Sequence, residues 1–275
     1  MPSHGLMQRA LRWAGAHPVA VLALLCLVQV VPTLWSRDYW AYDEVRHAAV
    51  LREMREGGDV FSLHLNGVPY PDKPPVYFWL VSGIATVLDT DAPPAFFLAS
   101  GLGGFLFLLA TWGLARVTVA SRAPAVALLA PLLILITPLF QLLLRTTRMD
   151  LLFGALITAS LACLYKGLGP EGSKRFTVIG FALAGTATLV KGPAGLGLPL
   201  AGALAYLIGT GRSRRLLSPD ALLGLGLAAT LGRQGLGLLG QAGRLAALGG
   251  AFGPMARQRL SDPFLLHWVD PVSYT

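Results

Sequence analysis

Charged residues are scarce in this chain of 275 residues: only 13% are Asp, Glu, Lys or Arg, whereas 54% are hydrophobic. Soluble domains average about 25% charged and roughly 45–50% apolar residues. A deficit of charge on this scale argues against a soluble domain and favours an integral membrane protein. The net charge of +8 does not indicate nucleic-acid binding, because the basic residues form short clusters between apolar runs and not one basic face.

Cysteines and common catalytic motifs are sparse as well. The two cysteines, Cys26 and Cys163, both lie inside apolar runs. We therefore expect them to be small buried side chains, with neither a disulfide framework nor metal-ligand spacing. The chain has no HExxH, paired CxxC, phosphate-binding loop or GxSxG motif. Their absence argues against zinc proteases, P-loop ATPases and α/β-hydrolases.

Long apolar runs are abundant. A helix needs roughly 17–25 mostly apolar residues to cross the bilayer core. We predict an all-α integral membrane protein, a multi-pass helical bundle with about seven spans, some of them short. The candidate spans are 18–35, 94–115, 124–143, 151–166, 176–190, 194–210 and 221–250.

Two apolar runs have alternative interpretations. The basic start and the run from 18 to 35 also fit a signal peptide, but no small-residue cleavage pattern follows, which favours a retained first span. The run 76–88 is short for a span, and its Tyr77, Phe78 and Trp79 suit an interfacial position. We therefore expect 76–88 not to cross.

The positive-inside rule predicts the orientation. With the N-terminus in the cytoplasm, the inner segments hold ten Lys or Arg against two acids, Glu171 and Asp220. The segment 36–93 then forms a first outer loop that contains juxtamembrane helices. The same membrane topology places six candidate site residues on the outer face, namely Asp43, Glu44, Lys73, Arg148, Asp150 and Lys191.

The outer loop has local structure of its own. Residues 44–54 form an imperfect amphipathic pattern, which predicts a helix lying on the membrane that ends at Gly57-Gly58. Asn66-Gly67 predicts a turn. Pro74-Pro75 predicts an extended or turn-like entry to the aromatic run.

Two acidic or mixed clusters in this loop are candidates for chemistry. Carboxylates such as Asp43 and Glu44 act elsewhere as general bases or hold a divalent cation. The alternative is an ordinary helix start, where acids are favoured by the dipole. Lys73, fixed by the two prolines after it, would place its ammonium against a phosphate. The alternative there is a surface turn with a snorkelling lysine.

Two further charged positions flank predicted spans. Arg148 and Asp150 begin the span 151–166, either as part of a site or as a dipole-favoured helix start. Lys191 lies between two apolar runs, before Gly-Pro. A lysine at the edge of a membrane segment is a functional candidate, although a turn with its ammonium at the headgroups explains it equally well.

The histidines and the C-terminal region carry weaker signals. We interpret His47 and His64 as solvated loop residues, and His267 as an interfacial histidine or a contributor to a site. Residues 221–250 are rich in Gly, Leu and Ala and predict one imperfect span followed by an outer tail. We therefore divide the chain into a catalytic membrane module, 1–220, and an uncertain region, 221–275.

Four segments together are far more specific than any one of them: YDEVRHA, GGDVFSLHLNGVPYPDKPPVYFWL, RTTRMDLLFGAL and ATLVKGPAG. This combination resembles the polyprenyl-phosphate-sugar-dependent glycosyltransferases of the GT-C fold, and among them the 4-amino-4-deoxy-L-arabinose transferases and protein O-mannosyltransferases. The resemblance covers about residues 36–200. At the tail, His267, Pro271 and Tyr274 look like a drifted family motif.

The resemblance implies a multi-pass enzyme of the bacterial inner membrane with its active site on the periplasmic face. It would move a hexose or pentose, with inversion, from a polyprenyl-phosphate donor to a lipid A-like glycolipid or a protein hydroxyl. Asp43 would be the catalytic base, with Glu44 as its neighbour in the same motif. Asp150 would sit opposite Asp43, and a divalent cation between them is the one cofactor implied. The implied donor-binding residues are Lys73, Lys191, Arg148 and Tyr70.

Length is the main departure from this family, whose members usually continue well beyond this point. We therefore keep a second hypothesis, a truncated or degenerate homologue that binds polyprenyl phosphate without turnover. A small transporter is disfavoured, because no internal repeat is visible and the key charges fall at one membrane edge.

Overall fold

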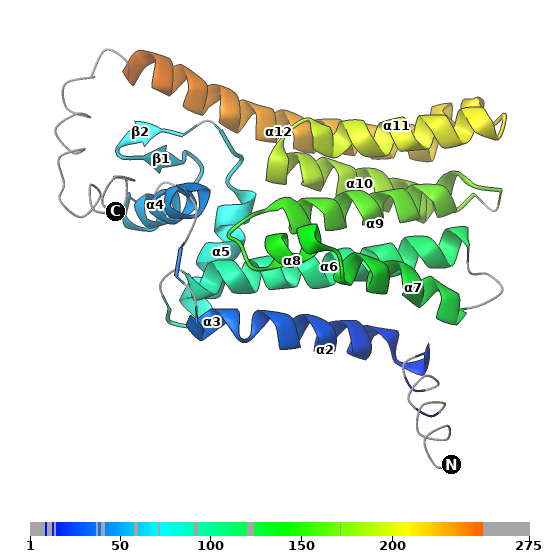
Figure 1. The fold of residues 1–275 in the computed structure, drawn as a ribbon. Helices are drawn as coiled ribbons and strands as arrows, with labels where there is room; N and C mark the ends of the chain where they lie inside the picture. The colour runs from blue at the N-terminus through cyan, green and yellow to red at the C-terminus, as the bar shows by residue number, and fades with distance from the viewer. Residues whose placement is uncertain are drawn as a thin grey trace, which may run out of the picture.

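A computed structural model describes residues 9, 13, 15–36, 38–39, 42–57, 60–70, 72–90, 93–119, 124–170 and 172–249 of the chain. Most of these residues are helical (Figure 1). The longer helices lie side by side and run alternately in opposite directions. They are α2 (Pro18–Val30), α6 (Pro94–Thr118), α7 (Pro124–Leu135), α9 (Asp150–Leu168), α10 (Lys174–Lys191), α11 (Ala194–Gly209) and α12 (Pro219–Gly249).

Only some of these helices have the length and composition of a membrane span. Among the described residues, α6 and α9 are long and apolar enough, and the bent pair of α7 and α8 (Pro138–Leu144) would be a third. Three shorter helices are also apolar, namely α2, α5 (Val76–Val87) and α11. A mostly helical fold is thus observed, whereas a multi-pass arrangement with about seven spans stays a prediction.

Two predicted spans are interrupted by proline. The predicted span 124–143 is two helices with a bend of 69° between them. Pro138 has no N–H to continue the first helix, and Thr137 caps the second by accepting a hydrogen bond from the Phe140 N–H at 3.4 Å. The predicted span 18–35 ends as a regular helix at Val30, and α3 (Thr33–Ser36) follows Pro32.

The described residues between α2 and α6 lie at one end of the bundle, on the left in Figure 1. They include α4 (Tyr42–Gly57), which was predicted over 44–54, and α5. They also include an antiparallel hairpin of β1 (His64–Leu65) and β2 (Val68–Pro69), so the fold is not purely α-helical. The predicted turn is confirmed, since Asn66 and Gly67 have φ angles of 56° and 74°.

The hairpin docks on α4 through the side chain of Glu53. One carboxylate oxygen accepts a hydrogen bond from the Gly67 N–H at 3.0 Å, and the other accepts one from the Asn66 N–H. Hairpin strands of two residues form too few contacts to be stable alone. The sequence showed the turn but not this partner, because Glu53 lies on the preceding helix.

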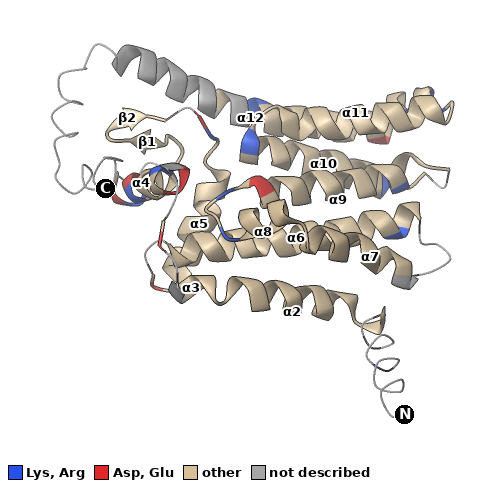
Figure 2. Cartoon of the chain, viewed as in Figure 1, with Lys and Arg blue, Asp and Glu red and all other residues tan. Residues whose placement is uncertain are grey.

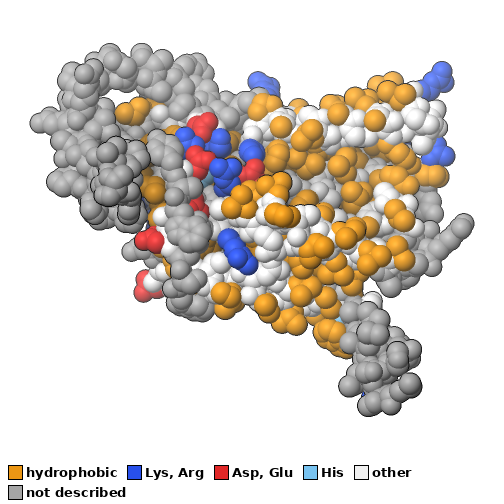
Figure 3. Space-filling view, viewed as in Figure 1, with side chains coloured by type: hydrophobic (Ala, Val, Ile, Leu, Met, Phe, Trp, Pro, Cys, Tyr) orange, Lys and Arg blue, Asp and Glu red, His pale blue; other side chains and the backbone are white. Residues whose placement is uncertain are grey.

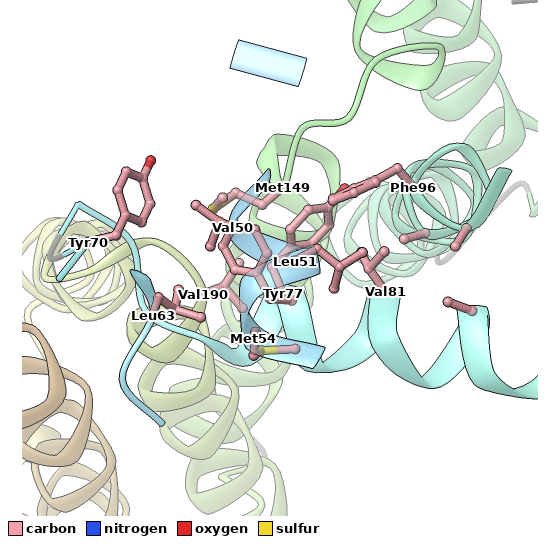
Figure 4. Packing of buried hydrophobic residues seen from close by; sticks show 14 residues of the cluster. Val50, Leu51, Met54, Leu63, Tyr70, Tyr77, Val81, Phe96, Met149 and Val190 are labelled. Atoms are coloured by element: carbon pink, nitrogen blue, oxygen red, sulfur yellow. The ribbon is translucent and has the colours of Figure 1, made fainter. Parts of the chain in front are cut away.

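A hydrophobic cluster joins this end segment to the bundle (Figure 4). Its side chains come from α4, the hairpin region, α5, α6, and the adjoining ends of α9 and α10. Members that are almost fully buried include Val50, Leu51, Tyr77, Phe96 and Val190. Burial of each such side chain contributes about 1.5–3 kcal/mol relative to exposure. The cluster therefore fixes α4 against the ends of the long helices.

Glycine allows α6 and α9 to approach closely, and one substitution tests this contact. A Cβ added at Gly103 would lie 2.8 Å from the backbone nitrogen of Leu152. We expect Gly103→Ala to destabilise the protein by about 1–3 kcal/mol through overpacking, measured as a lower melting temperature in detergent. Gly113 of the same helix has nothing within 4 Å of its added Cβ, so Gly113→Ala is the control. Equal melting of the two variants would contradict the prediction.

Candidate active site

The carboxylate of Asp43 lies between two arginines. Its Oδ1 accepts a hydrogen bond from Arg46 Nη2 at 2.9 Å, and its Oδ2 accepts one from Arg148 Nη2 at 2.7 Å. Asp43 and Arg46 are three residues apart on α4, so helical spacing brings them together. Arg148 comes from the connection between α8 and α9, 105 residues further along the chain. The Asp43 side chain remains one-third exposed, so it is accessible to a ligand.

A second carboxylate extends this arrangement. Asp72 Oδ2 accepts hydrogen bonds from Tyr70 Oη at 2.9 Å and from Lys73 Nζ at 3.1 Å. Arg46 Nη2 lies 3.7 Å from the same oxygen and so bridges Asp72 and Asp43. The arginine also lies over the Tyr70 ring, 5.7 Å from its centroid. We call the six residues the ionic cluster: Asp43, Arg46, Tyr70, Asp72, Lys73 and Arg148.

Protonation states within the ionic cluster follow from burial and pairing. Burial, together with the hydrogen bond to Asp72, raises the pKa of Tyr70, so its phenol stays neutral and donates. Burial alone would raise the pKa of Asp72, but the hydrogen bonds from Lys73 and Tyr70 and the charges of Lys73 and Arg46 lower it. Asp72 is therefore ionised at neutral pH and holds both cations in place.

A second ion pair joins the start of α9 to the end of α10. Lys191 Nζ donates to Asp150 Oδ1, and the ammonium lies 5.7 Å from the centroid of the Phe153 ring. α10 ends here because Lys191 precedes Gly192, whose φ of 86° ends the helix. Acidic and basic side chains gather around α4 and the connection from α8 to α9 (Figures 2 and 3).

The side chains of Glu44 and His47, on the buried side of α4, contact the backbone of Thr147. Glu44 is 1% exposed, and its Oε1 accepts a hydrogen bond from the Thr147 N–H at 3.2 Å. His47 is 4% exposed, and its Nδ1 donates to the Thr147 carbonyl at 2.8 Å. The prediction that His47 is a solvated loop residue is therefore wrong: it faces the buried side of a helix. His64 likewise lies half-buried on β1, where its Nδ1 is 2.9 Å from the Ser62 carbonyl.

The predicted divalent cation is not supported by the placement of its two carboxylates. Asp43 is paired with Arg46 and Arg148, and Asp150 with Lys191, so neighbouring positive charges oppose a metal ion there. No group of three or more His, Cys, Asp or Glu side chains suited to a metal occurs among the residues that the structure describes. The cation stays a prediction, and no step proposed below passes through it.

The sequence-predicted residues can now be placed. Asp43, Tyr70, Lys73 and Arg148 meet in the ionic cluster, whereas Asp150 and Lys191 pair with each other. Predicted site residue His267, with Pro271 and Tyr274, lies outside the described residues. Sequence reasoning missed Arg46, although its spacing from Asp43 on a predicted helix was the available signal.

Comparisons with known proteins agree with the family resemblance of the sequence. The dolichyl-phosphate-mannose-protein mannosyltransferase family matches residues 72–232. An undecaprenyl phosphate-alpha-4-amino-4-deoxy-L-arabinose arabinosyl transferase of Yersinia enterocolitica is 30% identical over 223 residues, which are 78% of this chain and 39% of that protein. A Pseudomonas aeruginosa protein of the same description is 30% identical over 200 residues, covering 71% and 36% of the two chains.

Solved structures give the same result. ArnT from Cupriavidus metallidurans bound to undecaprenyl phosphate aligns with a TM-score of 0.65 and 26% identity, covering 78% of this chain and 40% of that one. The apo structure of that protein has the same TM-score at 25% identity, covering 92% and 44%. The helical fold is thus that of the GT-C membrane proteins.

The chain belongs to the dolichyl-phosphate-mannose-protein mannosyltransferase family, within which it is similar to the 4-amino-4-deoxy-L-arabinose transferases. This confirms the family resemblance inferred from the four sequence segments. The chain spans about two-fifths of the length of the curated relatives that it matches.

His47 makes the stability of this site depend on pH. Burial lowers its pKa below the ordinary value, against a smaller opposing effect of the Thr147 hydrogen bond. The unfolded chain therefore binds a proton more readily than the folded one. Stability is complete above about pH 6.5, the ordinary pKa of histidine, and is lost as pH falls through the lower folded pKa.

We expect the melting temperature to fall more between pH 8 and pH 5 in the wild type than in His47→Asn. Asparagine keeps an N–H donor near the position of Nδ1 but does not titrate in this range. All other titrating groups are common to both proteins, so the difference reports His47. An equal fall in both proteins would contradict the assignment.

Proposed function

We propose that the ionic cluster transfers a sugar from a polyprenyl-phosphate donor to a hydroxyl of a cell-envelope acceptor, either a lipid A-like glycolipid or a protein. The observation that carries the proposal is Asp43, a partly exposed carboxylate held between Arg46 and Arg148 and linked through Asp72 to Lys73. The names of the relatives and the undecaprenyl phosphate bound to a structural neighbour support a lipid-phosphate donor.

The residues have complementary roles in this reaction. Breaking the bond between the sugar and the phosphate leaves negative charge on the phosphate, which Lys73, Arg148 and Lys191 stabilise. The acceptor oxygen attacks the anomeric carbon and transfers its proton to Asp43. Attack opposite the leaving phosphate inverts the anomeric centre, so one carboxylate base is sufficient and no covalent sugar–enzyme intermediate forms.

Pairing of Asp43 with two arginines bears on the order of events. Both carboxylate oxygens accept hydrogen bonds from guanidinium groups, and each oxygen keeps a second lone pair. A phosphate oxygen accepts the same charge-assisted hydrogen bond from a guanidinium group that a carboxylate oxygen does. A donor phosphate that takes the hydrogen bond of Arg148 therefore leaves Asp43 Oδ2 more open to the proton of the acceptor.

A binding protein without turnover is the second candidate. The observation in its favour is that both oxygens of the Asp43 carboxylate are already paired with arginines. The same cations that stabilise a leaving phosphate would hold polyprenyl phosphate as a bound ligand. The two candidates differ only in whether Asp43 accepts a proton.

Substitution of Asp43 separates these candidates. We expect Asp43→Asn to reduce sugar transfer by about 100-fold or more, because the amide cannot act as a base, while undecaprenyl phosphate binding is retained. Transfer is measured in proteoliposomes with a radiolabelled lipid-linked sugar, and binding by native mass spectrometry. Asp89→Asn is the control, since Asp89 is an exposed acid in a loop with φ of 45°, which asparagine tolerates.

The contradicting outcomes are distinct. Unchanged transfer by Asp43→Asn would remove Asp43 as the base. Binding of undecaprenyl phosphate by a wild-type protein that transfers no sugar from any donor would favour the binding protein.

We further propose that the chain is a multi-pass protein of the bacterial inner membrane, with a cytoplasmic N-terminus and the ionic cluster at the periplasmic face, in contact with membrane lipid. At the opposite end of the bundle α6 and α9 finish, α10 begins and α11 leads into a short 3-10 turn (Figure 1). Basic residues gather there, which fits a cytoplasmic face. They include Arg116, Lys166, Lys174, Arg212 and Arg214.

Cysteine labelling tests this orientation. In a variant without Cys26 and Cys163, single cysteines at exposed positions Phe61 and Arg145 should react with a membrane-impermeant maleimide in intact spheroplasts. A cysteine at exposed Arg212, at the other end of the bundle, should react only after permeabilisation. Labelling of positions 61 and 145 from opposite compartments would show that the proposed reaction centre cannot assemble.

A further inference from the structure

The connection between α8 and α9 presents Arg148 to Asp43. This 145–149 segment runs from Arg145 to Met149 and contains both buried and accessible residues. Thr147 and Met149 are almost fully buried, whereas Arg148 between them is exposed and reaches Asp43 at 2.7 Å. The direction of Arg148 therefore depends on how the backbone around Thr147 is held.

Three buried polar side chains hold that backbone. From α4, Glu44 accepts from the Thr147 N–H and His47 donates to the Thr147 carbonyl. From α6, Ser100 Oγ donates to the Thr146 carbonyl at 2.5 Å and lies 3.5 Å from the Arg148 carbonyl. Ser100 is 1% exposed. These contacts fix consecutive peptide groups from two helices that are far from the segment in sequence.

The position of α4 determines where both partners of the Asp43–Arg148 ion pair lie. α4 carries Asp43 itself and, one and four residues later, the side chains that bind Thr147. Movement of α4 would therefore shift Asp43 and the 145–149 segment together. The segment also leads directly into Asp150, and the Phe153 N–H donates to the Met149 carbonyl in the first turn of α9.

Stability alone does not account for three buried polar side chains here. A buried hydrogen bond contributes about 1 kcal/mol net, whereas a polar group left without its partner costs more. Buried polar networks instead select one geometry over its alternatives. In this protein the geometry selected is the one in which Arg148 lies on Asp43.

We propose that Ser100 and His47 are positioning residues that hold the 145–149 segment so that Arg148 meets the phosphate of the lipid donor. The inference rests on the proposed function for its substrate class. It goes beyond that function by assigning a role to two residues that do not touch the reacting atoms.

Ser100→Ala tests the proposal, with Ser160→Ala as the matched control. Ser160 is equally buried and donates a similar hydrogen bond to the Gly180 carbonyl at 2.7 Å, away from the ionic cluster. Loss of the hydrogen bond to Thr146 corresponds to a factor of about five in an equilibrium constant. The longer contact of Ser100 Oγ with Tyr77 Oη, at 3.4 Å, is lost as well. We expect Ser100→Ala to weaken undecaprenyl phosphate binding about fivefold and to speed hydrogen exchange at the Thr147 amide by a similar factor. Ser160→Ala should change neither.

A second pair of variants isolates the donor of His47. His47→Asn retains an N–H near Nδ1 and should bind undecaprenyl phosphate as the wild type does, whereas His47→Leu should lose affinity as Ser100→Ala does. If His47→Leu does not fold, Ser100→Ala decides the outcome, because it removes a single oxygen.

A double-mutant cycle shows whether Ser100 acts through Arg148. In an Arg148→Gln background, Ser100→Ala should change undecaprenyl phosphate affinity by less than about twofold, because the group that Ser100 positions is already absent. A full fivefold effect in that background would overturn the proposal. Equal effects of Ser100→Ala and Ser160→Ala would also overturn it, since both would then report bundle stability.

These measurements separate this inference from the proposed function. Amide exchange and undecaprenyl phosphate binding need no turnover, so they decide the positioning roles even if no sugar is transferred. Loss of transfer in Asp43→Asn, by contrast, decides the reaction and is independent of how the 145–149 segment is held.

Discussion

The ion pair between Asp43 and Arg148 is the contact on which the site depends. It joins a helix near the start of the chain to a loop 105 residues later, at 2.7 Å. Neither residue could hold this geometry alone, since both side chains are partly exposed and exposed ion pairs contribute less than about 1 kcal/mol. The surrounding fold must therefore determine where the two groups lie, and the pair is a result of that fold.

Two different kinds of interaction determine where Asp43 and Arg148 lie. The hydrophobic cluster around Tyr77 and Phe96 fixes the distance of α4 from the bundle, because its side chains come from α4, α5 and α6 together. Apolar burial is not directional, however, and tolerates small rotations and shifts. The hydrogen bonds of Glu44, His47 and Ser100 to the 145–149 segment are directional and fix the remaining freedom.

The sequence predicted the elements well and their contacts poorly. Helices over 94–115, 151–166, 176–190 and 194–210 were expected close to where α6, α9, α10 and α11 lie, because long apolar runs and flanking Gly or Pro are local signals. The break at Pro138 was also a local signal, but the apolar pattern on both sides obscured it.

Contacts between distant segments were predictable only where charge identified them. Asp43, Lys73 and Arg148 were predicted to lie on one face because ionic groups are rare in this chain, and the structure brings them together. His47 was misjudged, since nothing near it in sequence reveals the Thr147 carbonyl that it binds. Ser100 was missed because a serine within an apolar helix looks the same whether it is functional or not. Buried polar contacts between distant segments are thus harder to find from sequence than clusters of charged residues.

Charge pairing within the site links donor binding to activation of the base. Arg46, Lys73, Arg148 and Lys191 are each paired with a carboxylate, so a phosphate that takes the paired N–H displaces that carboxylate. Exchange of a carboxylate for a phosphate oxygen preserves a charge-assisted hydrogen bond to the same cation, so its net cost is small. Under the proposed function, the displaced group is the carboxylate of Asp43, which then has one oxygen free of guanidinium to accept a proton. Binding of the leaving phosphate would thereby favour deprotonation of the acceptor in the complex in which the sugar can be transferred.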